Sequence, residues 1–196
     1  MNFLAHIYLS GDNQKLMVGN FMGDFVKGSS FDHYDEIIVK GIWLHRAIDE
    51  YTDNHKIVAK SKDRLRAKYR HYSGVIVDVF YDHFLAKNWP NYHPEKLLSF
   101  TEKAYAILAS YKNIMPSKAQ YVLPYMMEGN WLYHYAKTEG IHKSLSGMAR
   151  RTKYNSKMEE AVNDLNEHYE DFEKEFTLFF SDLKDFCSNW IAKELT

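Results

Sequence analysis

The sequence contains little of what marks several large classes of protein. Cys187 is its only cysteine, which excludes a disulfide framework within the chain and is typical of a reducing compartment. No apolar run is long enough to span a bilayer. The N-terminal stretch MNFLAHIYLSGDNQK has no basic region before its apolar residues and no clear cleavage site, so it does not predict a signal peptide. We therefore expect a soluble cytoplasmic protein.

Net charge is also nearly absent. Lys and Arg number 25 and Asp and Glu 26, a formal net charge of −1, so no overall basic field indicates a nucleic-acid or membrane partner. Only 4 prolines and 9 glycines occur, and no low-complexity linker divides the chain. With 45% hydrophobic and 16% aromatic residues, 196 residues suffice to bury a substantial core. The composition predicts one domain, residues 1–196, and leaves the oligomeric state open.

Apolar residues recur with the period of an α-helix along nearly the whole chain. No segment alternates strongly enough to predict a strand. We expect an all-α fold, a single-domain helical bundle. The helices are expected at residues 3–9, 13–27, 33–54, 56–71, 75–89, 95–114, 117–137 with Pro124 as a kink or break, 141–150 and 156–192.

The segment VIVDVFYDHFLAKNW at residues 75–89 is apolar on almost every side of its helix, which predicts burial all round. Asp78 and Asp82 lie within it, one turn apart on the same stripe. Because an isolated buried carboxylate is costly, these acids require a partner or a metal ion. His83 points to a different side of the helix from Asp78, so the adjacent Asp-His pair is the weaker candidate.

Polar residues interrupt three other helices that the pattern predicts to be buried. They are His6 in the first helix, Asn20 and Asp24 in the second, and His45, Asp49 and Asp53, spaced four apart on one face, in the third. Together with the two aspartates of residues 75–89, they predict one site for a divalent cation. A mixed set of histidines and carboxylates suits Mn²⁺, Fe²⁺, Zn²⁺ or Mg²⁺, and no thiolate pattern of a structural zinc site is present.

Each of these polar residues also has an ordinary structural explanation. Asp49 and Asp53 could pair with the nearby Arg46 and Lys56. The two aspartates of residues 75–89 could form buried ion pairs with arginines elsewhere. His6 could be a hydrogen-bonded core or capping histidine. The metal prediction therefore depends on the whole set rather than on any single member.

Charge is unevenly distributed despite the balanced total. Residues 56–71 hold seven basic residues against Asp63, a net +6, and residues 159–175 hold eight acids against Lys174, a net −7. Two interpretations stay open. The two segments are solvated helix faces that pair with each other, or the basic helix binds an acidic partner.

Five motifs, in order along the chain, resemble a known family. They are MNFLAH at the N-terminus, GNFMGDFVKG at 19–28, GIWLHRAIDEYTDN at 41–54, DVFYDHFLAKNW at 78–89 and LSGMARR at 145–151. The set is similar to the bacterial acyl carrier protein phosphodiesterases, also called acyl carrier protein hydrolases, with a weaker echo, LNEHYEDFE, at 165–173. Residues 91–140 match poorly apart from the neighbourhood of Trp131, and we expect that region to shape partner selectivity.

The resemblance implies a divergent HD-type, all-helical metal phosphohydrolase. Its activity removes the 4′-phosphopantetheine arm from holo acyl carrier protein, which is both partner and substrate, and leaves the apo protein. The family depends on a divalent cation, typically Mn²⁺, with Mg²⁺ or Fe²⁺ as alternatives. Such an activity belongs to fatty acid biosynthesis and lipid metabolism.

The resemblance also implies roles for particular residues. The expected metal ligands are Asp24, at a family position linked to metal and activity, His45, Asp78 or Asp82, and His6. The expected catalytic residues are Asp24 itself, Asp49 or Asp82 to orient the attacking water, and Arg46 or a basic residue near position 150 to hold the phosphate. Because acyl carrier proteins are acidic, the basic helix is expected to dock the substrate through Arg64, Arg66 and Arg70.

Two other functions stay open at the level of sequence. An HD-like phosphohydrolase could act on a small nucleotide instead, because such enzymes need no Gly-rich phosphate loop. A catalytically silent helical module could bind an acidic partner without any reaction. Activity with Mn²⁺ separates these possibilities from a carrier-protein phosphodiesterase.

Overall fold

A computed structural model describes residues 1–28, 31 and 33–195 of the chain, and within these residues every regular element is a helix. The α-helices are α1 (Phe3–Tyr8), α2 (Gln14–Met22), α3 (Glu36–Asn54), α4 (Lys56–Tyr69), α5 (Ser73–Lys87), α6 (Leu97–Ser110), α7 (Ser117–Glu128), α8 (Trp131–His134), α9 (Thr138–Ala149), α10 (Ala161–Glu167) and α11 (Tyr169–Glu194). Short 3₁₀ turns are η1 (Gly23–Phe25), η2 (Arg70–Tyr72), η3 (Trp89–Asn91), η4 (Lys112–Ile114) and η5 (Met158–Glu160). The all-α prediction is confirmed, and the HD-type architecture stays a prediction.

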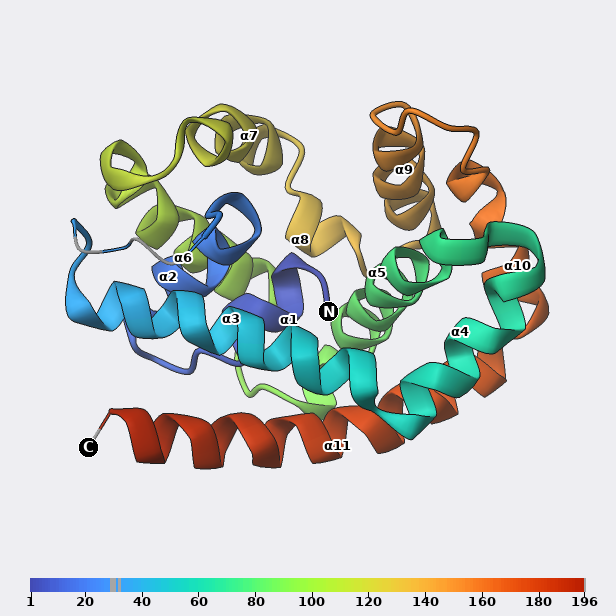
Figure 1. Cartoon of the computed structure of the whole chain (residues 1–196), viewed down its shortest axis with the longest axis horizontal. Helices are drawn as coiled ribbons and strands as arrows, with labels where there is room; N and C mark the ends of the chain where they lie inside the picture. Colours follow the sequence, from blue (N-terminus) through green and yellow to red (C-terminus); the bar gives the residue numbers. More distant parts are fainter. Residues whose placement is uncertain (29–30, 32, 196) are drawn as a thin grey trace.

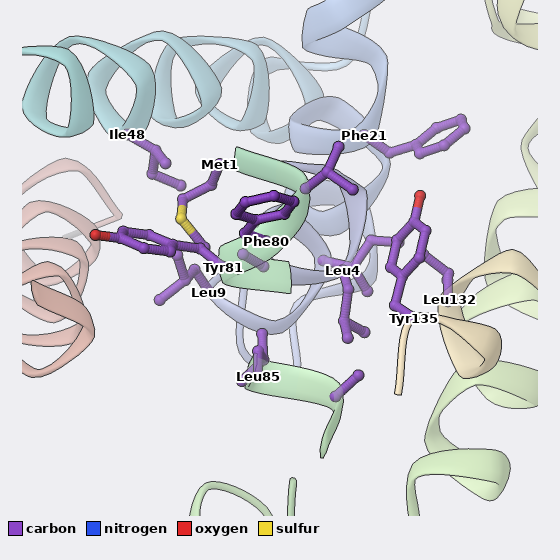
Figure 2. Close-up of a cluster of buried hydrophobic side chains, with 14 of the residues drawn as sticks. Met1, Leu4, Leu9, Phe21, Ile48, Phe80, Tyr81, Leu85, Leu132 and Tyr135 are labelled. Carbon is purple, nitrogen blue, oxygen red and sulfur yellow. The ribbon is translucent and has the colours of Figure 1, made fainter. Parts of the chain in front are cut away.

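Helix α5 forms the centre of the bundle. It contacts α1, α4, α9 and α11, and α11 runs along one side of the molecule beneath α3 and α4 (Figure 1). Figure 2 shows Phe80 and Tyr81 of α5 among buried side chains from α1 and α3 and from the segment that contains Leu132 and Tyr135. Burial on nearly all sides explains why the sequence of α5 is apolar on nearly all sides.

Local signals explain where several helices begin. The side chain of Asn13 accepts a hydrogen bond from the N–H of Leu16 at the start of α2, and Asp35 accepts one from Ile37 at the start of α3. These side chains satisfy backbone donors that have no partner within the helix. None of the described helices is both long and apolar enough to cross a membrane.

Three predicted boundaries differ from the structure. The helix expected at 156–192 is interrupted at His168, where the backbone leaves helical geometry between α10 and α11. Pro124 lies inside α7, and the break falls instead after Gly129, where Asn130 adopts left-handed backbone geometry with φ of 39°. The second helix ends at Met22 and continues as the turn η1. Periodicity did not predict these interruptions because the apolar stripe continues through each of them.

Helices α2 and α3 pack unusually closely through glycine. A Cβ atom added to Gly19 would lie 2.0 Å from the carbonyl oxygen of Ile38, and one added to Gly41 would lie 2.3 Å from that of Leu16. No side chain larger than hydrogen fits at either position without moving the backbone. The close approach sets the residues one turn further along each helix side by side, namely Gly23 at the start of η1 and His45 of α3.

Candidate functional site

Two histidines and an aspartate converge near the junction of α1 and α3. His6 comes from α1, and His45 and Asp49 come from consecutive turns of α3. One ligand atom from each lies within 4.8 Å of the other two. His6 Nε2 lies 3.3 Å from Asp49 Oδ1, and His45 Nε2 lies 3.1 Å from Asp49 Oδ2. The two imidazole rings stack with their centroids 4.1 Å apart.

Asn20 of α2 orients both histidines. Its side-chain oxygen accepts a hydrogen bond from Nδ1 of His6 at 2.8 Å, and its main-chain oxygen accepts one from Nδ1 of His45 at 2.9 Å. The Asn20 amide nitrogen donates to the carbonyl of His6 and to Ser10, which fixes the orientation of the amide. Because each Nδ1 is committed as a donor to Asn20, each ring turns its Nε2 toward Asp49. Metal-binding histidines are commonly oriented by a hydrogen bond of this kind.

Asp24 completes the cluster from the side of η1. Its Oδ1 lies 3.6 Å from His45 Nε2. The approach depends on Gly23, since a Cβ atom there would lie 2.2 Å from the His45 ring. The carboxylates of Asp24 and Asp49 are 45% and 43% exposed, whereas the side chain of His45 is only 5% exposed. Buried histidines therefore present nitrogen atoms to carboxylates that face solvent.

The charges in this cluster are strongly coupled. Burial opposes protonation of His45, but hydrogen bonds to Asp24 and Asp49 outweigh burial and raise its pKa to about 9. Burial also opposes ionisation of Asp49, but the hydrogen bonds from His45 and His6 lower its pKa. Burial and the neighbouring His45 lower the pKa of His6. The cluster thus holds ionised carboxylates beside one neutral and one protonated imidazole, and a divalent cation could take the place of that proton.

Asp78 joins the cluster through the N-terminal amine. The Met1 amine donates to Asp78 Oδ1 at 3.0 Å and lies 3.7 Å from Asp49 Oδ1. Burial lowers the pKa of this amine, but Asp78 and Asp49 outweigh burial and raise it to about 10. The ammonium group is therefore the cationic partner of Asp78, whose side chain is 30% exposed rather than buried as its helix pattern predicted.

Asp82 lies elsewhere, although it shares a helix stripe with Asp78. It is fully buried, and its two oxygens accept the N–H groups of Leu4 at 2.7 Å and Ala5 at 3.2 Å. Burial raises its pKa to about 7, against the effect of the Leu4 hydrogen bond. Both oxygens are used to hold the beginning of α1 against α5, so Asp82 positions His6 indirectly.

His83 and Asp53 also lie outside the cluster. His83 Nδ1 donates to the carbonyl of Tyr135, and its Nε2 accepts from the hydroxyl of Tyr169, so both ring nitrogens have structural partners. Asp53 is exposed and pairs with Lys62 at 2.6 Å. The weaker ranking of His83 in the sequence agrees with these contacts.

The predicted phosphate-binding and docking arginines have structural partners of their own. Arg46 donates to the carbonyl of Gly28 at 2.6 Å and lies over the rings of Phe31 and Trp43. Arg64 makes two hydrogen bonds to the buried carboxylate of Glu175 on α11, at 2.7 and 2.9 Å. The other two docking candidates are exposed: Arg66 pairs with Asp63 at 3.1 Å, and Arg70 lies in the turn η2 with φ of 53°.

A cavity of about 840 Å³ opens beside the cluster. Asp24 and Asp78 line it, together with Met1. Its apolar wall includes Phe3, Val79, Trp131, Tyr135 and Met148, and its polar wall includes Lys137, Lys143, Ser144, Arg150 and Arg151. The cavity thus joins a carboxylate-rich end to apolar and cationic walls from α5, α8 and α9.

Sequence reasoning missed two parts of this site. It noted Asn20 as a polar interruption but gave it no role, and the role depends partly on a main-chain carbonyl that no side-chain pattern encodes. It also missed the N-terminal amine. The cationic wall left a signal in the motif LSGMARR, from which only a basic residue near 150 was predicted.

Comparison with known proteins identifies the family of the chain. A family model described as acyl carrier protein phosphodiesterase matches residues 1–183. Curated proteins of that name from Photorhabdus laumondii and Yersinia enterocolitica are each 33% identical to the chain, over 190 and 181 residues. These matches cover 96% of both chains for the first protein, and 92% of this chain and 94% of the relative for the second. No solved structure matches. The chain belongs to the acyl carrier protein phosphodiesterase family.

Proposed function

We propose that this protein hydrolyses the phosphodiester that joins 4′-phosphopantetheine to holo acyl carrier protein and releases the apo protein. Membership of the family supports the activity, and the relatives' name gives the substrate. The observation that carries the proposal is the cavity, because Asp24 and Asp78 place carboxylates next to the His6–His45–Asp49 cluster on one side of it. A cytoplasmic location is part of the proposal.

The chemistry of the cluster fits a divalent cation. His6, His45 and Asp49 would hold it, with Asp24 as a further oxygen ligand, and Mn²⁺ suits this balance of nitrogen and oxygen donors, with Mg²⁺ or Fe²⁺ as alternatives. When bound, such an ion supplies a hydroxide at neutral pH and positive charge near the phosphoryl oxygens. The two Nδ1 contacts with Asn20 support this assignment, because they turn both Nε2 atoms toward Asp49.

The residues of the cavity suggest how the chain handles its substrate. Asp24 belongs to both the cluster and the cavity, so it is placed to accept the proton of the attacking water. Arg150 and Lys143, which also line the cavity, would balance the charge of the phosphate. We assign phosphate binding to these two residues rather than to Arg46, because the guanidinium of Arg46 donates to the carbonyl of Gly28 and lies over two aromatic rings.

The apolar wall supports a place for the pantetheine arm. Phe3, Val79, Trp131 and Met148 give the cavity a surface for a flexible chain that carries few charges. A cavity of about 840 Å³ lies within the range of sites that bind molecules of this size. A small nucleotide stays the alternative substrate, because the aromatic side chains of the same wall could stack on a base.

Mass spectrometry tests the proposed function directly. Holo acyl carrier protein incubated with the protein and Mn²⁺ should lose the mass of the phosphopantetheine arm. Asp24→Ala should abolish this loss while the helical circular dichroism stays unchanged. Asp53→Ala is the matched control, because Asp53 is an exposed acid near the same cluster that pairs only with Lys62 among the described residues. Activity on a nucleotide panel and none on the carrier protein would overturn the proposal, as would no activity at all.

A further inference from the structure

A second basic segment lies directly after α8. Residues 137–157 hold six basic residues against Glu139, a net +5. We call these six residues the basic rim: Lys137, Lys143, Arg150, Arg151, Lys153 and Lys157. All six are exposed, and they extend along α9 and the loop that follows it, on the side of the molecule away from α11 (Figure 1).

Among the described residues, the cations of the basic rim have no ion-pair partner. Across residues 1–28, 31 and 33–195, no acidic side chain forms an ion pair with any of its six members. The guanidinium of Arg151 donates to the carbonyl of Gly147 in α9, and Lys153 lies over the ring of Tyr154. Clustered cations of this kind repel one another and create a local positive potential that attracts an oppositely charged surface.

The basic rim lies beside the cavity in which we propose that the reaction takes place. Lys137, Lys143, Arg150 and Arg151 line the same cavity as Asp24 and Asp78. The bond to be cleaved joins the arm to a side chain of the carrier protein itself, so the surface of that protein must come against the mouth of the cavity. Residues 128–151 supply four cations and two acids, Glu128 and Glu139, to the cavity, so this part of the protein offers the carrier protein net positive charge.

We propose that the basic rim is the docking surface for an acidic face of the acyl carrier protein, in place of the basic helix α4. The inference rests on the proposed function and names the surface that recognises its substrate. Charge complementarity selects the partner face: a cluster of net charge +5 without internal partners attracts carboxylates close to the attachment site of the arm. Lys153 and Lys157 extend this surface beyond the cavity, where they can touch only the carrier protein.

Charge reversal tests the assignment with a matched control. The rim variant carries Lys143→Glu, Arg150→Glu and Arg151→Glu. The control carries Lys56→Glu, Arg66→Glu and Arg70→Glu, three exposed residues of the basic segment 56–71, so both variants change the net charge equally. We expect kcat/KM for holo acyl carrier protein to fall about 10-fold or more in the rim variant, chiefly through KM, and less than about 2-fold in the control.

A second variant separates docking from phosphate binding. Lys153→Glu with Lys157→Glu leaves every residue that lines the cavity intact, and we expect it to raise KM for the carrier protein several-fold. The Lys153→Glu with Lys157→Glu variant should lower the ratio of kcat/KM for holo carrier protein to kcat/KM for bis(4-nitrophenyl) phosphate with Mn²⁺. The triple rim variant also removes Lys143 and Arg150 from the phosphate, so it should lower both values. An unchanged ratio, or an equal loss in the α4 control, would overturn the docking assignment. A wild-type protein that leaves the arm in place would instead refute the proposed function.

Discussion

Two segments of this chain carry similar positive charge and use it differently. Residues 56–71, at net +6, have most of their charge neutralised by acids of the same molecule, whereas residues 137–157, at net +5, form the uncompensated basic rim. Lys60 and Arg64 pair with Glu175, Lys68 pairs with Asp164 and Glu160, and Lys62 pairs with Asp53. The net charge of a segment therefore does not predict a docking surface. Whether a basic segment can bind a partner depends on whether acidic side chains of the same molecule already pair with it.

The difference arises from the packing of distant helices. Helix α4 lies against α10 and α11, which carry the acidic run 159–175, so residues more than a hundred positions apart form ion pairs (Figure 1). The Arg64–Glu175 contact is the strongest example, because Glu175 is buried and also accepts from Ser61. Helix α9 packs against α5, α8, α10 and η5. Among the described residues, however, none of the cations of the basic rim forms an ion pair with the acids of α10 or η5, and four of them line the cavity instead.

The largest expected effect comes from the His6–His45–Asp49 cluster itself. His45→Ala removes a nitrogen donor and the ring that packs on Gly23, so turnover of holo acyl carrier protein should fall more than about 100-fold. Chelation of the wild-type protein should give a similar loss, restored by added Mn²⁺. Elemental analysis of the purified variant should find less bound metal. Full activity of the variant would show that the cluster of His6, His45 and Asp49 is not the catalytic centre beside which the docking surface was sought.

Asn20→Ala should produce the next largest loss. It removes the side-chain acceptor for His6 Nδ1 but keeps the main-chain acceptor for His45. We expect about 10–100-fold weaker metal binding, measured by titration with Mn²⁺, and partial recovery of turnover at high Mn²⁺. Charge reversal in residues 56–71 or 137–157 should not change this loss of metal affinity. Loss of activity that no metal concentration restores would show that Asn20 acts on folding rather than on the histidines.

Arg64→Ala sharpens the comparison on the side of α4. It leaves the buried carboxylate of Glu175 with Ser61 and Lys60 as partners but without its two arginine hydrogen bonds. We expect the free energy of unfolding to fall by about 1.5–3 kcal/mol, measured by urea denaturation, with kcat/KM nearly unchanged at temperatures where the variant is folded. A stable variant with a raised KM would return α4 to the role of docking surface.

The pH dependence of stability follows from the same ion pair. Burial raises the pKa of Glu175, but the hydrogen bonds from Arg64 and Ser61 outweigh it and lower the pKa below the ordinary value of 4.5. A carboxylate with a lowered pKa stabilises the folded state above its unfolded pKa, and this contribution is lost as the pH falls through the lowered value. Wild type should therefore lose more stability than Glu175→Gln when the pH falls below 4.5. Equal losses in urea unfolding would contradict the pairing.

The smallest expected effect is the response of KM to salt. Exposed charges are screened at physiological ionic strength, so KM for the carrier protein should rise several-fold as NaCl increases. The variant Lys153→Glu with Lys157→Glu should show a weaker dependence than wild type, whereas Arg66→Glu should keep it. Steady-state kinetics at several salt concentrations measures the slopes. Equal slopes in all three proteins would remove the distinction between the two basic segments.

The sequence predicted the helical class and part of the centre for identifiable reasons. Helical periodicity is a local property, so it located α3 and α5 well, and the i, i+4 spacing placed His45 and Asp49 on one face. The same periodicity could not separate Asp78 from Asp82, because both lie on one stripe of α5. The placement of α1 separates them: its backbone N–H groups occupy Asp82, while the amine of Met1 contacts Asp78.

Other parts depend on three-dimensional contacts that a pattern does not encode. Arg64 looked exposed because its helix is basic, and only the packing of α11 shows that it holds Glu175. Asp49 was expected to orient water, and it lies instead between two histidine nitrogens. Arg46 was expected at the phosphate, and it contacts Gly28. In each case the sequence identified a polar residue of note, and at least one of its partners came from outside its own helix.

The seating of α1 also has a consequence for the order of folding. Its N–H groups meet Asp82 across 78 and 77 residues, and the side chain of Asn2 donates to the hydroxyl of Tyr135 across 133. Contacts so distant in sequence carry a large loop-closure entropy, so they form late. A chain that has collapsed with its other helices in place still lacks His6 at the centre until α1 is seated. Metal affinity would therefore appear only at the final step of folding.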